Sequence, residues 1–166
     1  AGIFSMRMIF SSLLVFVLLL PSASKSDILP MIIDRNSLPY DLGPRKYENR
    51  ASKYDNSTSK YDNLESKYDN SPSKYANSPS NYDNRIGGDR NIVTEDGKVI
   101  GYYVFGEDGI MNLFNYTWRR VAYLPSGGRT RSVFTEEGWC GTIAEIRGKL
   151  ALGITQSCYL EFRFLD

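Results

Sequence analysis

A tyrosine occurs at every seventh residue across the middle of this chain, and this spacing limits what the middle can fold into. The tyrosines are Tyr40, Tyr47, Tyr54, Tyr61, Tyr68, Tyr75 and Tyr82. Asn-Ser-Pro-Ser is typical of the residues between them, as in 70–73 and 77–80. Asparagine stands two places after tyrosine from Asn49 to Asn84. The array separates an apolar start of the chain from an aromatic-rich end.

A seven-residue period can describe a coiled coil, but the chemistry of these heptads argues against one. Each heptad has one apolar position, whereas a coiled coil needs two. Ser, Asn and Asp favour turns and caps, and Pro72 and Pro79 would interrupt a helix. On a strand, an odd period would place successive tyrosines on opposite faces. We therefore expect residues 25–85 to be a low-complexity linker or stalk, mostly disordered from residue 41, with regularly spaced aromatic contacts.

The start of the chain predicts export. The apolar run Met8–Leu20 follows Arg7 and precedes small residues around Ser22. This order is typical of a secretory signal peptide, which we place at residues 1–24 with cleavage after Ser24. The run is shorter than the roughly 20 residues of a membrane-spanning helix, so we expect no stable anchor after cleavage. The mature protein should be secreted, periplasmic or part of the cell envelope.

The charge balance argues against nucleic acid as a partner. The whole chain has 20 basic and 19 acidic residues, and removal of residues 1–24 takes away one basic residue, Arg7. The mature chain then has no net charge. Nucleic-acid binding depends on a basic surplus that displaces counterions from phosphate, and this chain has none.

The sequence has two cysteines, Cys140 and Cys158, and no histidine. In an exported chain such a pair predicts one disulfide, worth about 3 kcal/mol in chain-entropy models. Two free buried thiols are the alternative. Two cysteines without histidine argue against a structural zinc site, and we expect no metal and no cofactor.

Residues 86–166 predict an all-β domain, a small antiparallel meander of hairpins. Residues 91–103 align without gaps on residues 112–124, and a third copy starts at Ser132. Each unit has β-forming residues, a polar turn ending near glycine, and a second aromatic strand. The alternating segment Cys158–Phe164 predicts a half-buried strand, and we expect six to eight strands and no helix after Gly88. Residues 27–34 are either a short strand docked on this domain or a disordered lead.

Aromatic and basic side chains of this domain are the candidate binding residues. Aromatic rings on a rigid sheet can stack on sugars, and arginines in a Gly-rich loop can contact an anion or a glycan. Core packing and a solvated loop explain the same residues, and Tyr102 and Tyr103 must point to opposite faces. The candidates are Tyr102, Tyr103, Tyr123, Trp118, Arg129 and Arg131.

We identify no catalytic residue and expect a non-enzymatic binding or adhesion protein. The lack of histidine removes Ser-His and Cys-His nucleophiles. The expected partner is a polysaccharide or protein of the cell wall or host surface, with affinity raised by the repeated tyrosines. One alternative is a carbohydrate-acting hydrolase that uses paired acids such as Glu136 and Glu137. Another is a structural protein cross-linked through its tyrosines. Asn56 and Asn115 begin glycosylation sequons.

Two resemblances add to these expectations. The Asn-Ser-Pro-Ser-x-Tyr-Asp-Asn array, followed by residues 99–103, 138–141 and 148–159, resembles small exported bacterial proteins of unknown function. It implies an envelope or extracellular protein. Asp96–Lys98, Tyr102-Tyr103 and Glu107–Met111 locally resemble the hairpin repeats of choline- and glucan-binding cell-wall modules. Those modules hold ligand between aromatic pairs, although Ile100 stands where their motif has its first tryptophan.

Overall fold

The structure is a computed structural model that describes residues 26–163. The predicted signal peptide lies outside these residues. One eight-stranded sheet forms the body of the protein, with the order β1-β8-β7-β6-β5-β4-β3-β2. Its strands are β1 (Leu29–Ile32), β2 (Asn91–Val93), β3 (Val99–Phe105), β4 (Met111–Phe114), β5 (Arg120–Leu124), β6 (Ser132–Thr135), β7 (Gly138–Ile146) and β8 (Lys149–Ile154). The mostly β fold confirms the predicted fold class.

The sheet is nearly closed and barrel-like because its two edges meet. Ile28, just before β1, forms a parallel bridge with Ile92 of β2. The Ile28 amide donates to the Asn91 carbonyl, and the Val93 amide donates to the Ile28 carbonyl, each at 2.9 Å. On its other side β1 pairs in parallel with β8. The segment before the heptads is therefore a docked strand, one of the two forms expected for it.

From β2 to β8, each strand pairs antiparallel with the next one along the chain, and the turns predicted at 95–97, 136–138 and 147–149 are among the connections. Gly97 has a φ of +84° in the β2–β3 turn. Arg147 and Gly148 have φ values of +53° and +77° in the β7–β8 turn, the backbone of a tight type I′ hairpin. The β2–β3 and β4–β5 hairpins occupy the two aligned copies of the 21-residue repeat.

The last described element is a helix, α1 (Gln156–Arg163), so the prediction of a strand beginning at Cys158 is wrong. The Thr155 hydroxyl accepts a hydrogen bond from the Cys158 amide at 3.4 Å, the geometry of an N-cap. Cys158 and Phe162, four residues apart, face the core together, whereas Leu160 is 49% exposed. The apolar residues of this segment alternate in the sequence, but on the helix Cys158 and Phe162 lie on the buried face and Leu160 does not.

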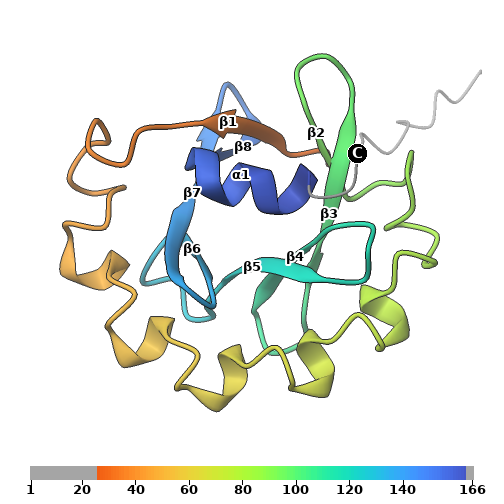
Figure 1. Cartoon of the computed structure of the whole chain (residues 1–166), viewed down its shortest axis with the longest axis horizontal. Coiled ribbons are helices and arrows are strands. Elements are labelled where there is room, and N and C mark those ends of the chain that lie inside the picture. Colours follow the sequence, from red (N-terminus) through yellow and green to blue (C-terminus); the bar gives the residue numbers. More distant parts are fainter. Residues whose placement is uncertain (1–25, 164–166) are drawn as a thin grey trace, which may run out of the picture.

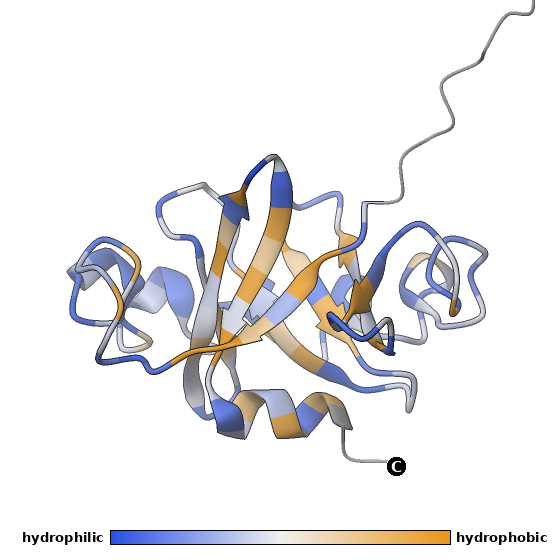
Figure 2. Ribbon diagram, turned by 90° about the horizontal axis from the view of Figure 1, so that it is seen from above, coloured by the Kyte–Doolittle hydropathy of each residue, from blue (hydrophilic) through white to orange (hydrophobic). Residues whose placement is uncertain are grey.

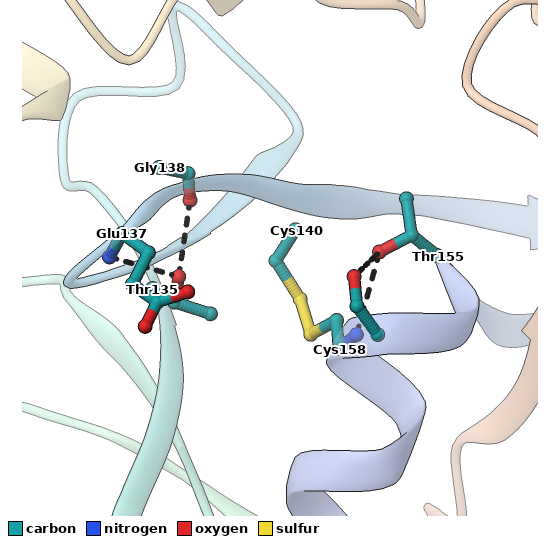
Figure 3. Close-up of a disulfide and its surroundings, with 7 residues drawn as sticks. Thr135, Glu137, Gly138, Cys140, Thr155 and Cys158 are labelled. Atoms are coloured by element: carbon teal, nitrogen blue, oxygen red, sulfur yellow. Dashed lines mark hydrogen bonds between the residues drawn. A yellow bond between two sulfur atoms is a disulfide. The ribbon is translucent and has the colours of Figure 1, made fainter.

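A disulfide links Cys140 of β7 to Cys158 of α1, with the Cα atoms 5.6 Å apart, which confirms the predicted pairing (Figure 3). Both cysteines belong to the main core inside the curved sheet, where α1 covers the apolar side chains. That core consists of Ile28, Ile92, Ile100, Tyr103, Met111, Leu113, Val121, Ala122, Val133, Cys140, Ile143, Leu152, Ile154, Cys158 and Phe162.

The heptads form an ordered arc around the sheet, not the disordered linker that we expected. We define the arc as residues 40–90. It runs around the outside of the sheet from the end of β1 to the start of β2 (Figure 1). It is mostly hydrophilic, whereas the strands hold most of the hydrophobic residues (Figure 2). Its short 3₁₀ turns are η1 (Tyr47–Asn49), η2 (Tyr54–Asn56), η3 (Tyr61–Asn63), η4 (Tyr68–Asn70) and η5 (Tyr75–Asn77).

Candidate functional site

Buried asparagines hold the arc together. Each asparagine ends a turn and donates its side-chain amide to two carbonyls, six and eight residues earlier. Asn70, for example, donates to the carbonyls of Asp62 at 2.7 Å and Leu64 at 2.8 Å. The same pattern repeats from Asn49 to Asn84, and all these residues are at most 3% exposed. These bonds replace the helix or strand hydrogen bonds that a Ser- and Pro-rich chain cannot make.

The series continues into the sheet through Asn91, the first residue of β2. Its amide donates to the Arg85 carbonyl, six residues back, at 3.1 Å. It also lies 3.0 Å from the Tyr116 hydroxyl. We call Asn49, Asn56, Asn63, Asn70, Asn77, Asn84 and Asn91 the asparagine row.

A polar side chain on the outer face of the sheet contacts each of the first six residues of the asparagine row. The Tyr102 hydroxyl donates to the Asn77 carbonyl at 2.7 Å, and the Tyr123 hydroxyl donates to the Asn56 carbonyl at 2.8 Å. Contacts of this kind attach each heptad that contains one of these asparagines to the sheet. The other contacts join Thr130 to Asn49, Arg120 to Asn63, Asn112 to Asn70 and Tyr116 to Asn84.

The heptad tyrosines are exposed while the asparagines beside them are buried. Their exposed fractions lie between 59% and 68%. Each 3₁₀ turn begins with tyrosine and ends with asparagine. Because the asparagine side chain is buried, the tyrosine two residues earlier faces solvent, and this arrangement recurs every seven residues. We call Tyr40, Tyr47, Tyr54, Tyr61, Tyr68, Tyr75 and Tyr82 the tyrosine row.

Some rings of the tyrosine row carry a cation on one face. The Lys53 ammonium lies 5.4 Å from the centre of the Tyr47 ring, and Arg85 lies 4.3 Å from the centre of the Tyr82 ring. Such contacts are worth about 0.5–1 kcal/mol at exposed sites. They orient the rings without burying them.

The charges around the tyrosine row neutralise one another. The Lys74 ammonium lies 2.8 Å from an Asp69 oxygen. This hydrogen bond raises the pKa of Lys74 and lowers the pKa of Asp69. Lys67 lies between Asp62 and Asp108, at 3.1 Å and 3.2 Å. The row therefore presents neutral aromatic rings between internally paired charges.

The repeat allows a comparison of equivalent positions within one chain. Tyrosine stands at the first position of all seven heptads. The asparagine two places on has a structural reason, because it binds buried carbonyls. The exposed tyrosine has no such buried contact: none of the hydrogen bonds described for residues 26–163 uses a hydroxyl of the tyrosine row, and cation–π contacts are made by only some of its rings. The third and fourth positions after tyrosine vary, reading Gly-Pro, Arg-Ala, Ser-Thr, Leu-Glu, Ser-Pro, Ser-Pro and Arg-Ile.

The structure buries three of the binding residues predicted from the sequence. Tyr102 and Tyr103 point to opposite faces, but both faces are covered, by the arc and by the main core, and they are 0% and 4% exposed. Tyr123 is also buried beneath the arc. An aromatic pair that holds ligand, as the cell-wall hairpin resemblance implied, is therefore not accessible at Tyr102-Tyr103. The sequence indicated that aromatic residues alternate between the two faces of a sheet, but not that the arc covers the outer face.

Burial also changes the acid–base chemistry of these phenols. It raises the pKa of Tyr123 to about 12, and it raises the pKa of Tyr102 and of Tyr116 further. Their hydroxyls are engaged with backbone carbonyls of the arc. These tyrosines are structural.

The other predicted binding residues are exposed, with Trp118 in one turn and the two arginines in another loop. Trp118 is 53% exposed in the β4–β5 turn, where its φ of +62° is unusual for a residue other than glycine. Arg129 lies in the β5–β6 loop with a guanidinium nitrogen 3.4 Å from an Asp55 oxygen of the arc. Arg131, two residues on, is exposed.

The acids considered for a hydrolase lie at the β6–β7 turn. A Glu136 carboxylate oxygen is 3.3 Å from the buried Arg120 guanidinium. Arg120 also donates to the Asn63 carbonyl at 2.7 Å, and burial lowers its pKa. Glu136 thus balances a buried charge that ties the arc to the sheet, while Glu137 faces solvent.

Both glycosylation sequons begin with a buried asparagine. Asn56 is 3% exposed and belongs to the asparagine row. The Asn115 side-chain oxygen accepts hydrogen bonds from the Thr117 hydroxyl and amide at 2.7 Å and 3.0 Å. A glycan on the Asn56 amide nitrogen would break its hydrogen bonds to the Glu48 and Arg50 carbonyls, and the Asn115 amide nitrogen is 3.5 Å from the Glu161 carbonyl.

Comparison with protein-family models, with curated proteins and with solved structures found no match to this chain. Within residues 26–163, no helix has the length and hydrophobicity needed to cross a membrane. In the same part of the chain, no group of three His, Cys, Asp or Glu side chains is placed to bind a metal ion.

Proposed function

We propose that this chain is an exported, non-enzymatic binding protein of the cell envelope or extracellular space, and that the tyrosine row is its ligand-binding surface. The sheet, α1 and the asparagine row act as a scaffold. The row presents seven rings of the same kind at a constant sequence interval.

One observation carries this proposal. The seven tyrosines are retained at equivalent positions although each is more than half exposed. The third and fourth positions after each tyrosine, most of them half-buried, vary among the heptads, whereas the tyrosine is present in all seven. A retained exposed aromatic residue is typical of a recognition surface, because aromatic side chains contribute large contact areas at low entropic cost.

The repetition supplies the mechanism for affinity. A contact with one tyrosine would be weak, at most about 1–2 kcal/mol. Once a ligand is held by one ring, its contact with a second ring is an intramolecular step. Several such contacts can raise avidity by about 10²–10⁴ over a single contact. The asparagine row keeps the rings in place and so lowers the entropic cost of binding.

A variant with Tyr54, Tyr61 and Tyr68 replaced by serine tests the proposal. We expect this variant to remain folded, because the three side chains are exposed, and to lose at least about tenfold in retention on purified bacterial cell envelopes and on immobilised mucin. The matched control replaces the exposed aromatic residue Phe105, which lies outside the row, by serine. Equal retention of the row variant and the wild-type protein on both surfaces would refute the proposal.

The exposure of the row also favours a second candidate function, as a structural protein cross-linked through tyrosines. In the presence of peroxide and a peroxidase, two phenols each lose one electron and one proton, and a carbon–carbon bond joins the rings. Peroxide is reduced to water. Mass spectrometry of the cross-linked protein should find dityrosine in the tyrosine row and not at Tyr102 or Tyr123. Dityrosine distributed without regard to burial would contradict this candidate.

A further inference from the structure

We infer that the ligand of the tyrosine row is a neutral, linear polysaccharide that stacks sugar rings at several points along its length on several tyrosines. This inference rests on the proposed function and narrows it to one class of ligand. It depends on the charge of the arc, on the arrangement of the rings and on their regular interval.

The charges of the arc argue against a charged polymer. From Lys46 to Asn84 the sequence has six basic and six acidic residues. Several of the lysines are already paired, as Lys74 is with Asp69 at 2.8 Å and Lys60 with Asp55 at 3.6 Å. A polyanion needs unpaired cations to replace its counterions, and a polycation needs unpaired carboxylates. Nucleic acids, which also stack on aromatic rings, are disfavoured for the same reason.

The rings of the row are separate platforms. The ring–ring contacts described for residues 26–163 all lie in the sheet, such as Tyr102 against Phe114, and none joins two tyrosines of the row. Proline-rich peptides dock into grooves between neighbouring aromatic residues, and the row has no such groove pairs. A pyranose, by contrast, presents a flat face of C–H groups that packs on a single aromatic ring. The tyrosine hydroxyl remains available for the hydroxyls of the sugar.

The regular interval favours a ligand that is itself repetitive. The asparagine row repeats the same hydrogen bonds within the arc from one heptad to the next, so each tyrosine has the same place in its own turn. The same aromatic side chain is present in all seven heptads, so the ligand can meet the same kind of ring at each of them. A homopolymer meets both conditions, because it offers the same face at a constant repeat.

Titration with soluble, uncharged β- and α-glucans of increasing length tests the inference. We expect affinity to rise by at least about tenfold between oligomers that can contact one ring and polymers that can contact several. Binding should change little with salt, since no ion pairs form. Tyr54, Tyr61 and Tyr68 replaced by phenylalanine should keep binding within a few-fold, whereas the serine variant should lose at least about tenfold.

Heparin and polyproline complete the test. Binding to either of them, with no binding to any glucan, would overturn the inference in favour of a polyanion or a proline-rich partner. If no glucan binds but the serine variant still loses retention on cell envelopes, the ligand class is wrong and the binding function stands. If the serine variant binds envelopes as the wild-type protein does, the proposed function itself fails.

Discussion

The hydroxyl of Tyr102, on β3, donates a buried hydrogen bond to the carbonyl of Asn77, at the end of η5, across 2.7 Å. Tyr102 has no exposed surface and packs against the rings of Phe114 and Tyr116, with ring centres 5.3 Å and 5.2 Å away. The contact joins the two layers of the protein, the outer face of the sheet and the arc. It shows why the arc is ordered although almost every residue in it is polar.

Replacement of Tyr102 by phenylalanine should therefore weaken the attachment of the arc. The variant leaves the Asn77 carbonyl without its buried donor, and we expect a loss of about 1–2 kcal/mol in the free energy of unfolding. Hydrogen exchange should accelerate in residues 70–84. Tyr75→Phe, which removes an exposed hydroxyl from the same heptad, is the control and should change neither quantity.

The asparagine row should not tolerate aspartate. In Asn70→Asp the amide donor becomes a carboxylate that faces the carbonyls of Asp62 and Leu64, and we expect a loss of about 2–4 kcal/mol at neutral pH. The folded-state pKa of this aspartate should lie above its unfolded value, because only the protonated form can donate. The destabilisation should therefore diminish as the pH falls. Denaturant unfolding at several pH values measures it.

Asn81 provides the control for this variant. Its side-chain oxygen accepts a hydrogen bond from the Asp83 amide at 3.0 Å, a role that aspartate can also perform. Asn81→Asp should stay within about 0.5 kcal/mol of the wild-type protein. Equal losses for both variants would show that the direction of the side-chain hydrogen bond does not matter.

Alkaline pH should unfold the outer layer. The pKa of Tyr123 is raised by burial from 10.0 to about 12. The folded state then holds a proton that the unfolded state releases, so the stability contributed by this group is complete below pH 10 and is lost toward pH 12. Phenolate absorbance should show a late phase that coincides with loss of the β-sheet signal in circular dichroism. Tyr123→Phe should reduce that phase, and a single early phase for all tyrosines would contradict the prediction.

Trp118 occupies a backbone conformation better suited to glycine. In the 21-residue repeat it is equivalent to Gly97, and the two residues have φ values of +62° and +84°. Trp118→Gly should raise the free energy of unfolding by about 0.5 kcal/mol, after the extra entropy of glycine in the unfolded state is included. Gly97→Ala should lower it by about 1 kcal/mol, although a Cβ there meets no atom within 4 Å. Thermal unfolding of both variants checks the pair.

Removal of the disulfide should release α1 before the rest of the fold. Replacement of Cys140 and Cys158 by serine should cost about 3 kcal/mol, since the bridge spans 18 residues. Amide exchange should rise first in residues 156–163, whereas the asparagine row, on the outer face of the sheet, should keep its protection. A reductant should have this effect on the wild-type protein and none on the serine variant. Unchanged exchange in α1 would contradict the prediction.

Local sequence determined the hairpins of this protein, and the presence of only two cysteines left one possible disulfide within the chain. Turns such as 95–97 and 147–149 depend on nearby residues, and their glycines adopt the positive φ values that the turns require. The period of seven was equally visible, as was the asparagine two places after each tyrosine. These features arise within a few residues and can be read without knowing the rest of the fold.

Only the tertiary structure decided that the heptads are ordered and which tyrosines face solvent. The Asn77 carbonyl needs Tyr102 from a strand 25 residues later, and Asn70 needs Asn112 from 42 residues later. The same dependence on distant contacts turned the alternating segment after Cys158 into a helix, because the bridge to Cys140 and the core place Cys158 and Phe162 on one side. A polar repeat has too little apolar surface to order itself, so its structure comes from the sheet that it surrounds.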